Sequence, residues 1–352
     1  MSGALLSCRD LAVEFNTGGR ILRAVDGVDL DVEPGQTVAI VGESGCGKST
    51  LARAIMGLTP ASRGSIRLEG REITGLSPRE LRPLRPAVQM VFQNPYGSLN
   101  PRLTVGRIIE EPMSVQKIGT SQSRRERVRE LLSMVGLAAG AERQYPHEFS
   151  GGQRQRIAIA RALALNPKLI VCDEPVSALD VSVQAQVLNL LVRLQRDLGI
   201  SYLFISHDLS VVRHLAHRTV VMYLGRIVAQ STSRSFWNVP LHPYVAALKQ
   251  ATPTMDVLDA GYVPPPVLEG EIPSALNPPP GCRFSSRCPH VLPLCRESYP
   301  ALRQVSSTES VACHRVEIRP DGVATTPWGL VSVPGVVMPP APASEPLLAR
   351  VA

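Results

Sequence analysis

The residues best suited to chemistry in this chain form a glycine-rich phosphate loop. Residues 42–50 read Gly-Glu-Ser-Gly-Cys-Gly-Lys-Ser-Thr. Glycines at this spacing let backbone N–H groups curl around a β-phosphate, the lysine reaches the β- and γ-phosphates, and the first hydroxyl after it binds Mg²⁺. ATP with Mg²⁺ is therefore the expected ligand pair. The expected nucleotide-binding set is Gly42, Glu43, Ser44, Gly45, Cys46, Gly47, Lys48, Ser49 and Thr50.

Two adjacent carboxylates downstream complete the candidate chemistry. Asp173 follows a short apolar run and is expected to hold Mg²⁺ through its water shell, with Ser49 as a second ligand. Glu174, the next residue, is expected to orient and polarise the attacking water. His207 lies just beyond a second apolar run and is expected to contact the γ-phosphate and fix the geometry of Glu174. These residues predict hydrolysis of a nucleotide.

The elements that must position these residues can be inferred from the hydrophobic pattern. Residues 38–41, 169–172 and 202–205 are short runs without polar alternation, typical of strands buried on both faces of a parallel sheet. A helix is expected after the phosphate loop, with Leu51, Ala54, Ile55 and Leu58 on one face and Pro60 at its end. Further helices are expected from Ser123, with a capping-box pattern, and up to Gly199.

The composition limits the class of protein. The 352 residues carry 37 basic and 30 acidic side chains, a net charge of +7, and only 4% are aromatic. A solvated basic surface is the simplest interpretation, and no basic run is interleaved with stacking rings, so we expect no nucleic-acid partner. No stretch approaches the roughly 20 apolar residues of a membrane helix. The amino terminus shows no secretion signal, so a cytoplasmic protein is expected.

The region from about Leu5 to Val239 resembles ABC-transporter ATPases. The resemblance rests on residues 42–50, Gln93, Ser150-Gly151-Gly152-Gln153, Asp173-Glu174, Asp180 and His207. It implies that the fold is α/β, a P-loop NTPase domain of the ABC type with a helical subdomain, extended here by a small Pro/Cys-rich carboxy-terminal part. The expected domains are 1–238 for the ATPase, with the helical subdomain at about 94–150, 239–320 for the extension, and 321–352 for a disordered tail.

The same resemblance implies roles for individual residues. Gln93 would contact Mg²⁺ and the attacking water, and Phe15 is the candidate to stack on adenine, with a core role as the alternative. Asp180 would lie in the loop that crosses a dimer interface. Ser150, Gly151, Gly152 and Gln153 would form the signature sequence that contacts ATP held by a second ATPase subunit. One chain would therefore make half of each site.

A closer resemblance, to ATPase subunits of dipeptide and oligopeptide importers, rests on residues 91–102, 172–186 and 241–244. It implies a second, unlike ATPase subunit, two membrane permease subunits and an extracytoplasmic solute-binding protein as partners, at the cytoplasmic side of the membrane. Relatives with similar motifs import nickel, glutathione or antimicrobial peptides, which leaves the solute open. A soluble ABC ATPase acting on DNA or ribosomes is the alternative of another class.

Four of the seven cysteines are clustered in the extension, namely Cys282, Cys288, Cys295 and Cys313. Stable disulfides are not expected in a reducing cytoplasm, which suggests a metal or iron–sulfur group. The region 269–314 resembles the extension of peptide-importer ATPases, in which such a set can hold a 4Fe-4S cluster. Zinc and free thiols that pack in a core are the alternatives, as is a role for the extension in redox or metal sensing.

Overall fold

The computed structural model describes residues 3–237, 240–251, 270–318, 324–327 and 329–330. Its centre is an eight-stranded sheet in the order β11-β12-β10-β9-β3-β8-β7-β6, in which β9, β3, β8, β7 and β6 are parallel. The strands are β3 (Thr37–Val41), β6 (Val88–Val91), β7 (Leu169–Asp173), β8 (Ser201–Ser206), β9 (Arg218–Tyr223), β10 (Arg226–Thr232), β11 (Arg303–Ser306) and β12 (Glu309–Val311).

The central strands form where the sequence predicts them. Every residue of β3, β7 and β8 is buried, which is why these runs lack polar alternation. The helices α7 (Val181–Leu198) and α8 (Leu209–Leu215) come after β7 and β8, and α7 ends at Gly199 in the left-handed conformation, as expected. The carboxyl ends of the parallel strands therefore meet at one edge of the sheet, where the phosphate loop and Asp173 lie.

A second, antiparallel sheet lies beside the phosphate loop. Its order is β2-β1-β4-β5, with β1 (Leu6–Thr17), β2 (Arg20–Val32), β4 (Arg63–Leu68) and β5 (Arg71–Glu72). Apolar side chains of β1 and β2 share one core with α1 (Lys48–Ile55) and with the main sheet. The helix α1 is shorter than predicted: it ends at Ile55, and Leu58 is 52% exposed beyond it, because the chain turns at Gly57 with φ 63°.

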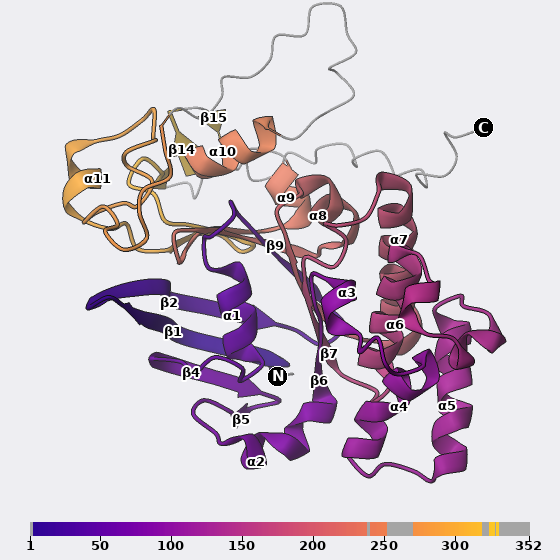
Figure 1. Ribbon diagram of the computed structural model, residues 1–352. Helices are drawn as coiled ribbons and strands as arrows, with labels where there is room; N and C mark the ends of the chain where they lie inside the picture. The colour runs from indigo at the N-terminus through magenta and orange to yellow at the C-terminus, as the bar shows by residue number, and fades with distance from the viewer. Residues whose placement is uncertain (1–2, 238–239, 252–269, 319–323, 328, 331–352) are drawn as a thin grey trace, which may run out of the picture.

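The helical lobe is formed by the chain segment between β6 and β7 in the sequence. It makes up one side of the molecule (Figure 1). The predicted start of α5 at Ser123 is wrong: the helix begins at Ser121, and Thr120 is its cap, because the Thr120 and Ser123 side chains bond reciprocally to each other's backbone N–H. The lobe's α4 and α5 pack against α6, which begins after the predicted boundary at residue 150. The helices are α3 (Pro95–Ser98), α4 (Val105–Val115), α5 (Ser121–Met134), η2 (Ala139–Arg143), η3 (Pro146–Glu148) and α6 (Gly151–Leu163).

The carboxy-terminal extension lies away from the helical lobe (Figure 1). Its strands β11 and β12 continue the main sheet from β10, an addition that the sequence did not reveal. Further elements are α2 (Pro78–Leu81), η1 (Arg82–Ala87), α9 (Ser233–Trp237), α10 (Pro243–Gln250), α11 (Pro293–Glu297), β13 (Glu317–Ile318), β14 (Ala324–Thr326) and β15 (Gly329–Leu330). Within the segment from 321 that was expected to be a disordered tail, β14 and β15 form a small sheet with β13, and residues 331–352 lie outside the described part.

Among the described helices, none is long and apolar enough to span a membrane.

Candidate nucleotide-binding site

The phosphate loop connects β3 to α1, the context that this motif requires. Two of its glycines cannot be replaced without strain. Gly42, at φ 152°, lies against the Met222 carbonyl, and Gly47, at φ 104°, lies against the Ala24 carbonyl; a Cβ at either position would overlap that oxygen. Glycine is needed at both because the backbone of the loop passes directly over neighbouring backbone.

Lys48 is held over the loop by backbone oxygens. Its ammonium group donates to the carbonyls of Gly42 (2.8 Å) and Glu43 (3.0 Å), and the residue is only 4% exposed. A charged amine bound in this way keeps its direction without a competing carboxylate. Lys48 is therefore placed to meet a phosphate that enters the loop.

Ser49 and Asp173 form the candidate Mg²⁺ site. The Ser49 hydroxyl donates to Asp173 Oδ1 at 2.8 Å, and Asp173 is 5% exposed. Burial raises the pKa of Asp173 and the nearby Glu174 carboxylate raises it further, whereas the Ser49 hydrogen bond lowers it. A buried carboxylate with a raised pKa is stabilised by a cation, and hydroxyl and carboxylate oxygens are the ligands that Mg²⁺ prefers. The residues present fit Mg²⁺, and the metal would neutralise phosphate charge.

Glu174, Gln93 and His207 converge on one another. Gln93 Nε2 donates to Glu174 Oε2 at 3.0 Å, and His207 Nδ1 lies 3.2 Å from the same oxygen. Glu174 has φ 47°, unusual for a residue with a side chain, and its N–H donates to the Ile205 carbonyl of β8 (3.1 Å). The backbone of β8 thus holds the backbone of Glu174 in this conformation, and the Gln93 and His207 side chains contact one oxygen of the Glu174 carboxylate.

These side chains surround one cavity of about 570 Å³. Phe15 belongs to its lining and is 40% exposed, so its ring is available to a ligand rather than part of the core. Glu43 and Cys46 line a smaller neighbouring cavity of about 180 Å³ instead. The lining of the larger cavity is Phe15, Leu22, Arg23, Ala24, Ser44, Gly45, Gly47, Lys48, Ser49, Thr50, Gln93, Glu174, His207, Leu224, Gly225 and Ala275.

The signature residues lie apart from this cavity. Ser150 caps α6: its hydroxyl accepts the Gln153 N–H (3.3 Å), and Gln153 Oε1 accepts the Ser150 N–H (3.0 Å). Asp180 caps α7 by accepting the Val183 N–H (3.0 Å), and Gly152 leaves no room for a Cβ beside the Val183 side chain. The beginnings of α6 and α7 are therefore packed together, with Ser150 and Asp180 exposed. Helix N-termini bind anions. Because the exposed N-terminus of α6 does not line this cavity, an anion bound there would not be one held in this chain's own cavity.

The four clustered cysteines do not form a metal centre in the described residues. Cys282, Cys288 and Cys295 belong to or pack against an apolar cluster with Phe284, and Cys313 belongs to another. Burial raises the pKa of Cys282 to about 12 and that of Cys313 to about 11, which favours protonated thiols. In the part of the chain described here, no group of three or more His, Cys, Asp or Glu side chains could hold a metal ion. The expected 4Fe-4S cluster has no support in this arrangement.

Sequence reasoning missed the residues that support the phosphate loop from the extension. Arg287 bonds the Glu43 carboxylate, and Tyr244 Oη accepts the Glu43 N–H at 2.8 Å. Tyr244 stood out only through a family resemblance, and Arg287 belonged to no motif. Their separation from Glu43 by more than 200 positions leaves no spacing pattern to recognise.

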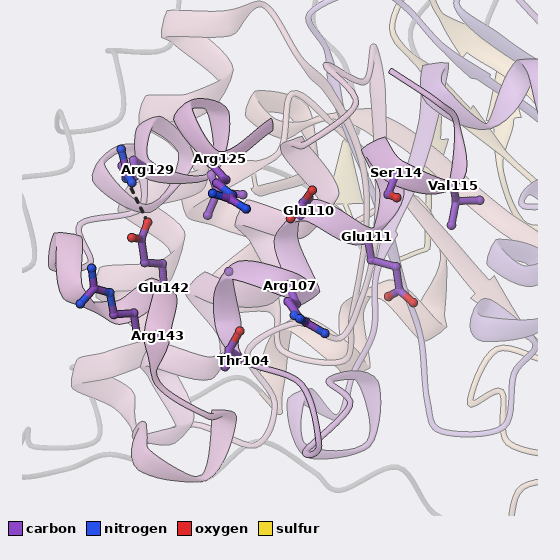
Figure 2. Close-up of a pocket in the computed structure, with 12 residues that line it drawn as sticks. Thr104, Arg107, Glu110, Glu111, Ser114, Val115, Arg125, Arg129, Glu142 and Arg143 are labelled. Atoms are coloured by element: carbon purple, nitrogen blue, oxygen red, sulfur yellow. Dashed lines mark hydrogen bonds and ion pairs between the residues drawn. The ribbon is translucent and has the colours of Figure 1, made fainter. Parts of the chain in front are cut away.

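A further cavity, of about 620 Å³, lies in the helical lobe (Figure 2). Its lining has charges of both signs, among them Arg107 and Glu111 on α4 and Arg129, which bonds Glu142 at 3.2 Å. None of the predicted phosphate-binding residues lines it. It therefore belongs to a different surface of the ATPase region, on α4, which follows Gln93 along the chain.

The comparisons with known proteins agree with this geometry. The family models described as "ABC transporter" and "Oligopeptide/dipeptide transporter, C-terminal region" match residues 25–177 and 229–295. The chain is 50% identical to the oligopeptide transport ATP-binding protein OppF of Escherichia coli (strain K12), over 89% of this chain and 96% of that protein. It is also 50% identical to the oligopeptide transport ATP-binding protein AppF of Bacillus subtilis (strain 168), over 83% of this chain and 89% of that protein.

Among solved structures, the dimeric post-hydrolysis state of the ATP-binding cassette MJ0796 bound to ADP and Pi is similar, with a TM-score of 0.60 and 31% identity over 65% of this chain and 99% of that one. The two family models together match parts of both the ATPase region and the extension. Since half of the aligned residues are identical to OppF over nearly its whole length, the chain belongs to the ABC transporter family, among its ATP-binding proteins.

Proposed function

We propose that this protein is the ATP-hydrolysing subunit of an importer for dipeptides or oligopeptides. The observation that carries the proposal is the gathering of Gln93, Glu174 and His207 with the phosphate loop around one cavity, in a chain whose relatives OppF and AppF are named for oligopeptide transport. The match of residues 229–295 to the oligopeptide/dipeptide transporter region supports the same substrate class. An importer of nickel, glutathione or antimicrobial peptides would use the same ATP chemistry, and a soluble ABC ATPase is the alternative without transport.

Each site residue has a role in this proposal. Residues 42–50 bind the phosphates, Ser49, Gln93 and Asp173 hold Mg²⁺, and Phe15 stacks on adenine. Glu174 orients the attacking water, and its carboxylate is kept in place by Gln93 and His207, which both contact Oε2. Hydrolysis then depends on positioning and on neutralising phosphate charge.

A second ATPase subunit completes the site. Ser150 to Gln153 lie at an exposed helix N-terminus away from the cavity of their own chain, which favours contact with ATP held by a partner. Asp180, exposed at the start of α7, would lie at the same interface. We propose an unlike ATPase as this partner, two membrane permeases, and a solute-binding protein on the other side of the membrane. The subunit then lies peripherally on the cytoplasmic side.

The Gln93 loop offers a route from the permeases to the site. It leads into α4, whose charged side chains line the cavity of Figure 2, while Gln93 itself contacts Glu174. A permease segment bound on this side would therefore act on a residue that touches the catalytic carboxylate. We assign residues 1–238 to the ATPase, with a helical lobe from about 94, and 239–320 to the extension.

The test is ATPase activity in membranes that contain the co-encoded permeases and partner ATPase. Activity is measured with the solute-binding protein loaded with dipeptides, longer peptides, nickel or glutathione, and with unloaded binding protein as the control. Stimulation by peptide-loaded binding protein is expected. Stimulation by nickel or glutathione alone would replace the substrate class, and activity indifferent to every loaded protein would contradict a transport function.

A further inference from the structure

The carboxy-terminal extension contacts the phosphate loop through Arg287. The guanidinium group forms a two-pronged ion pair with Glu43, with Nη1 to Oε2 at 2.8 Å and Nη2 to Oε1 at 3.1 Å. The Arg287 side chain is 6% exposed and that of Glu43 24%. Paired, planar geometry with little solvent makes this one of the stronger kinds of ion pair. It joins residues 244 positions apart, one of them the second residue of the phosphate loop.

Glu43 is held at its backbone as well. Its N–H donates to Tyr244 Oη at 2.8 Å, and the Tyr244 ring is fully buried against Tyr223 and Phe284, with ring centroids 4.7 and 5.4 Å away. The Glu43 carbonyl in turn accepts from Lys48 at 3.0 Å. One residue therefore connects the extension to the lysine that meets the phosphates.

A second arginine of the extension is linked to the phosphate loop through the turn between β9 and β10. Arg283, buried with 6% of its side chain exposed, bonds the Asp26 carboxylate and the Leu224 carbonyl. Leu224 and Gly225 form the turn between β9 and β10, and the Gly225 N–H donates to the Cys46 carbonyl of the phosphate loop at 2.8 Å. The extension thus contacts the loop directly at Glu43 and indirectly through Leu224 and Gly225.

We propose that Arg287 is a positioning residue for nucleotide binding, which makes ATP affinity depend on the folded extension. By pairing with Glu43, Arg287 fixes the carbonyl that directs Lys48 and cancels a negative charge beside the phosphate site. Without Arg287, the Glu43 carboxylate is unpaired, competes with phosphate for Lys48 and repels the anionic ligand. This inference rests on the proposed binding of ATP at residues 42–50.

The experiment measures the dissociation constant of Mg-ATP for the full-length chain, together with KM and kcat. Arg287→Met is expected to weaken Mg-ATP binding about tenfold, which corresponds to about 1.4 kcal/mol of binding free energy. It should also raise KM more than it lowers kcat. The matched control is Arg296→Met, which removes the same charge from an exposed position on α11 and should stay within about twofold of wild type.

Rescue separates positioning from a general loss of structure. Adding Glu43→Gln to Arg287→Met removes the unpaired charge and should restore most of the lost affinity. Arg287→Lys, which keeps the charge without the planar fork, should fall between wild type and Arg287→Met, and it replaces that variant in the comparison if Arg287→Met does not fold. Equal affinities of Arg287→Met and Arg296→Met, or no rescue by Glu43→Gln, would overturn the inference. Failure of the wild type to bind ATP would instead overturn the proposed function.

Discussion

Replacing His242 with asparagine should make the fold more resistant to acid. His242 is 1% exposed, its ring lies beside Phe284 with 5.7 Å between ring centroids, and its Nδ1 accepts the Tyr244 N–H at 3.1 Å at the start of α10. Burial lowers the pKa of His242 from 6.5 to about 3. The folded protein therefore keeps this imidazole neutral at a pH where the unfolded chain would protonate it.

The sign and size of the effect are set by this difference. Above pH 6.5 the imidazole is neutral in both states and adds no pH dependence to the free energy of unfolding. Below pH 6.5, and down to about pH 3, only the unfolded chain takes up the proton, so stability falls as the pH falls. The slope is about 1.4 kcal/mol per pH unit, which gives a loss of about 2 kcal/mol at pH 5.

The assay is thermal unfolding of the wild type and of His242→Asn from pH 7.5 to pH 5. Asparagine can offer an oxygen to the same Tyr244 N–H but does not titrate, and the other six of the seven histidines are common to both proteins. On acidification the wild type should lose about 4–8 °C more than the variant, since 1 kcal/mol corresponds to roughly 2–4 °C in domains of this kind. Parallel unfolding midpoints across the pH range would refute the reasoning.

Three further predictions concern the nucleotide site and its surroundings. Glu174→Gln should keep ATP binding and trap a closed dimer while phosphate release falls at least about a hundredfold, and wild-type turnover would contradict the role of Glu174. Lys48→Ala should abolish nucleotide binding in a titration with a fluorescent ATP analogue, so undiminished affinity would remove residues 42–50 from the site. Gly152→Ala should lower stability by about 1–3 kcal/mol in thermal unfolding, because its Cβ overlaps Val183. Gly151→Ala, whose Cβ would meet only the end of the Leu179 side chain at 3.3 Å, is the control, and equal losses would contradict this packing.

The hydrolytic centre could be predicted because local sequence determines it. In a glycine-rich loop between a buried strand and a helix, the backbone N–H groups converge at the N-terminus of the helix. Carboxylates at the ends of parallel strands lie at one edge of the sheet. The structure accordingly brings Ser49 to Asp173 and Gln93 to Glu174. Helix boundaries were less certain, since Thr120 and Ser123 both carry a hydroxyl able to cap α5 and only the folded backbone selects between them.

What the sequence alone determined is therefore the candidate chemistry: which residues we propose to bind phosphate, hold Mg²⁺ and orient water. Only the tertiary structure decided how the extension takes part, because contacts between residues far apart in the chain have no spacing signature. Arg287 reaches Glu43 across 244 positions, and Ala275 enters the lining of the candidate nucleotide cavity, in an extension whose Phe284 packs against Tyr223 and Tyr244 in the folded chain.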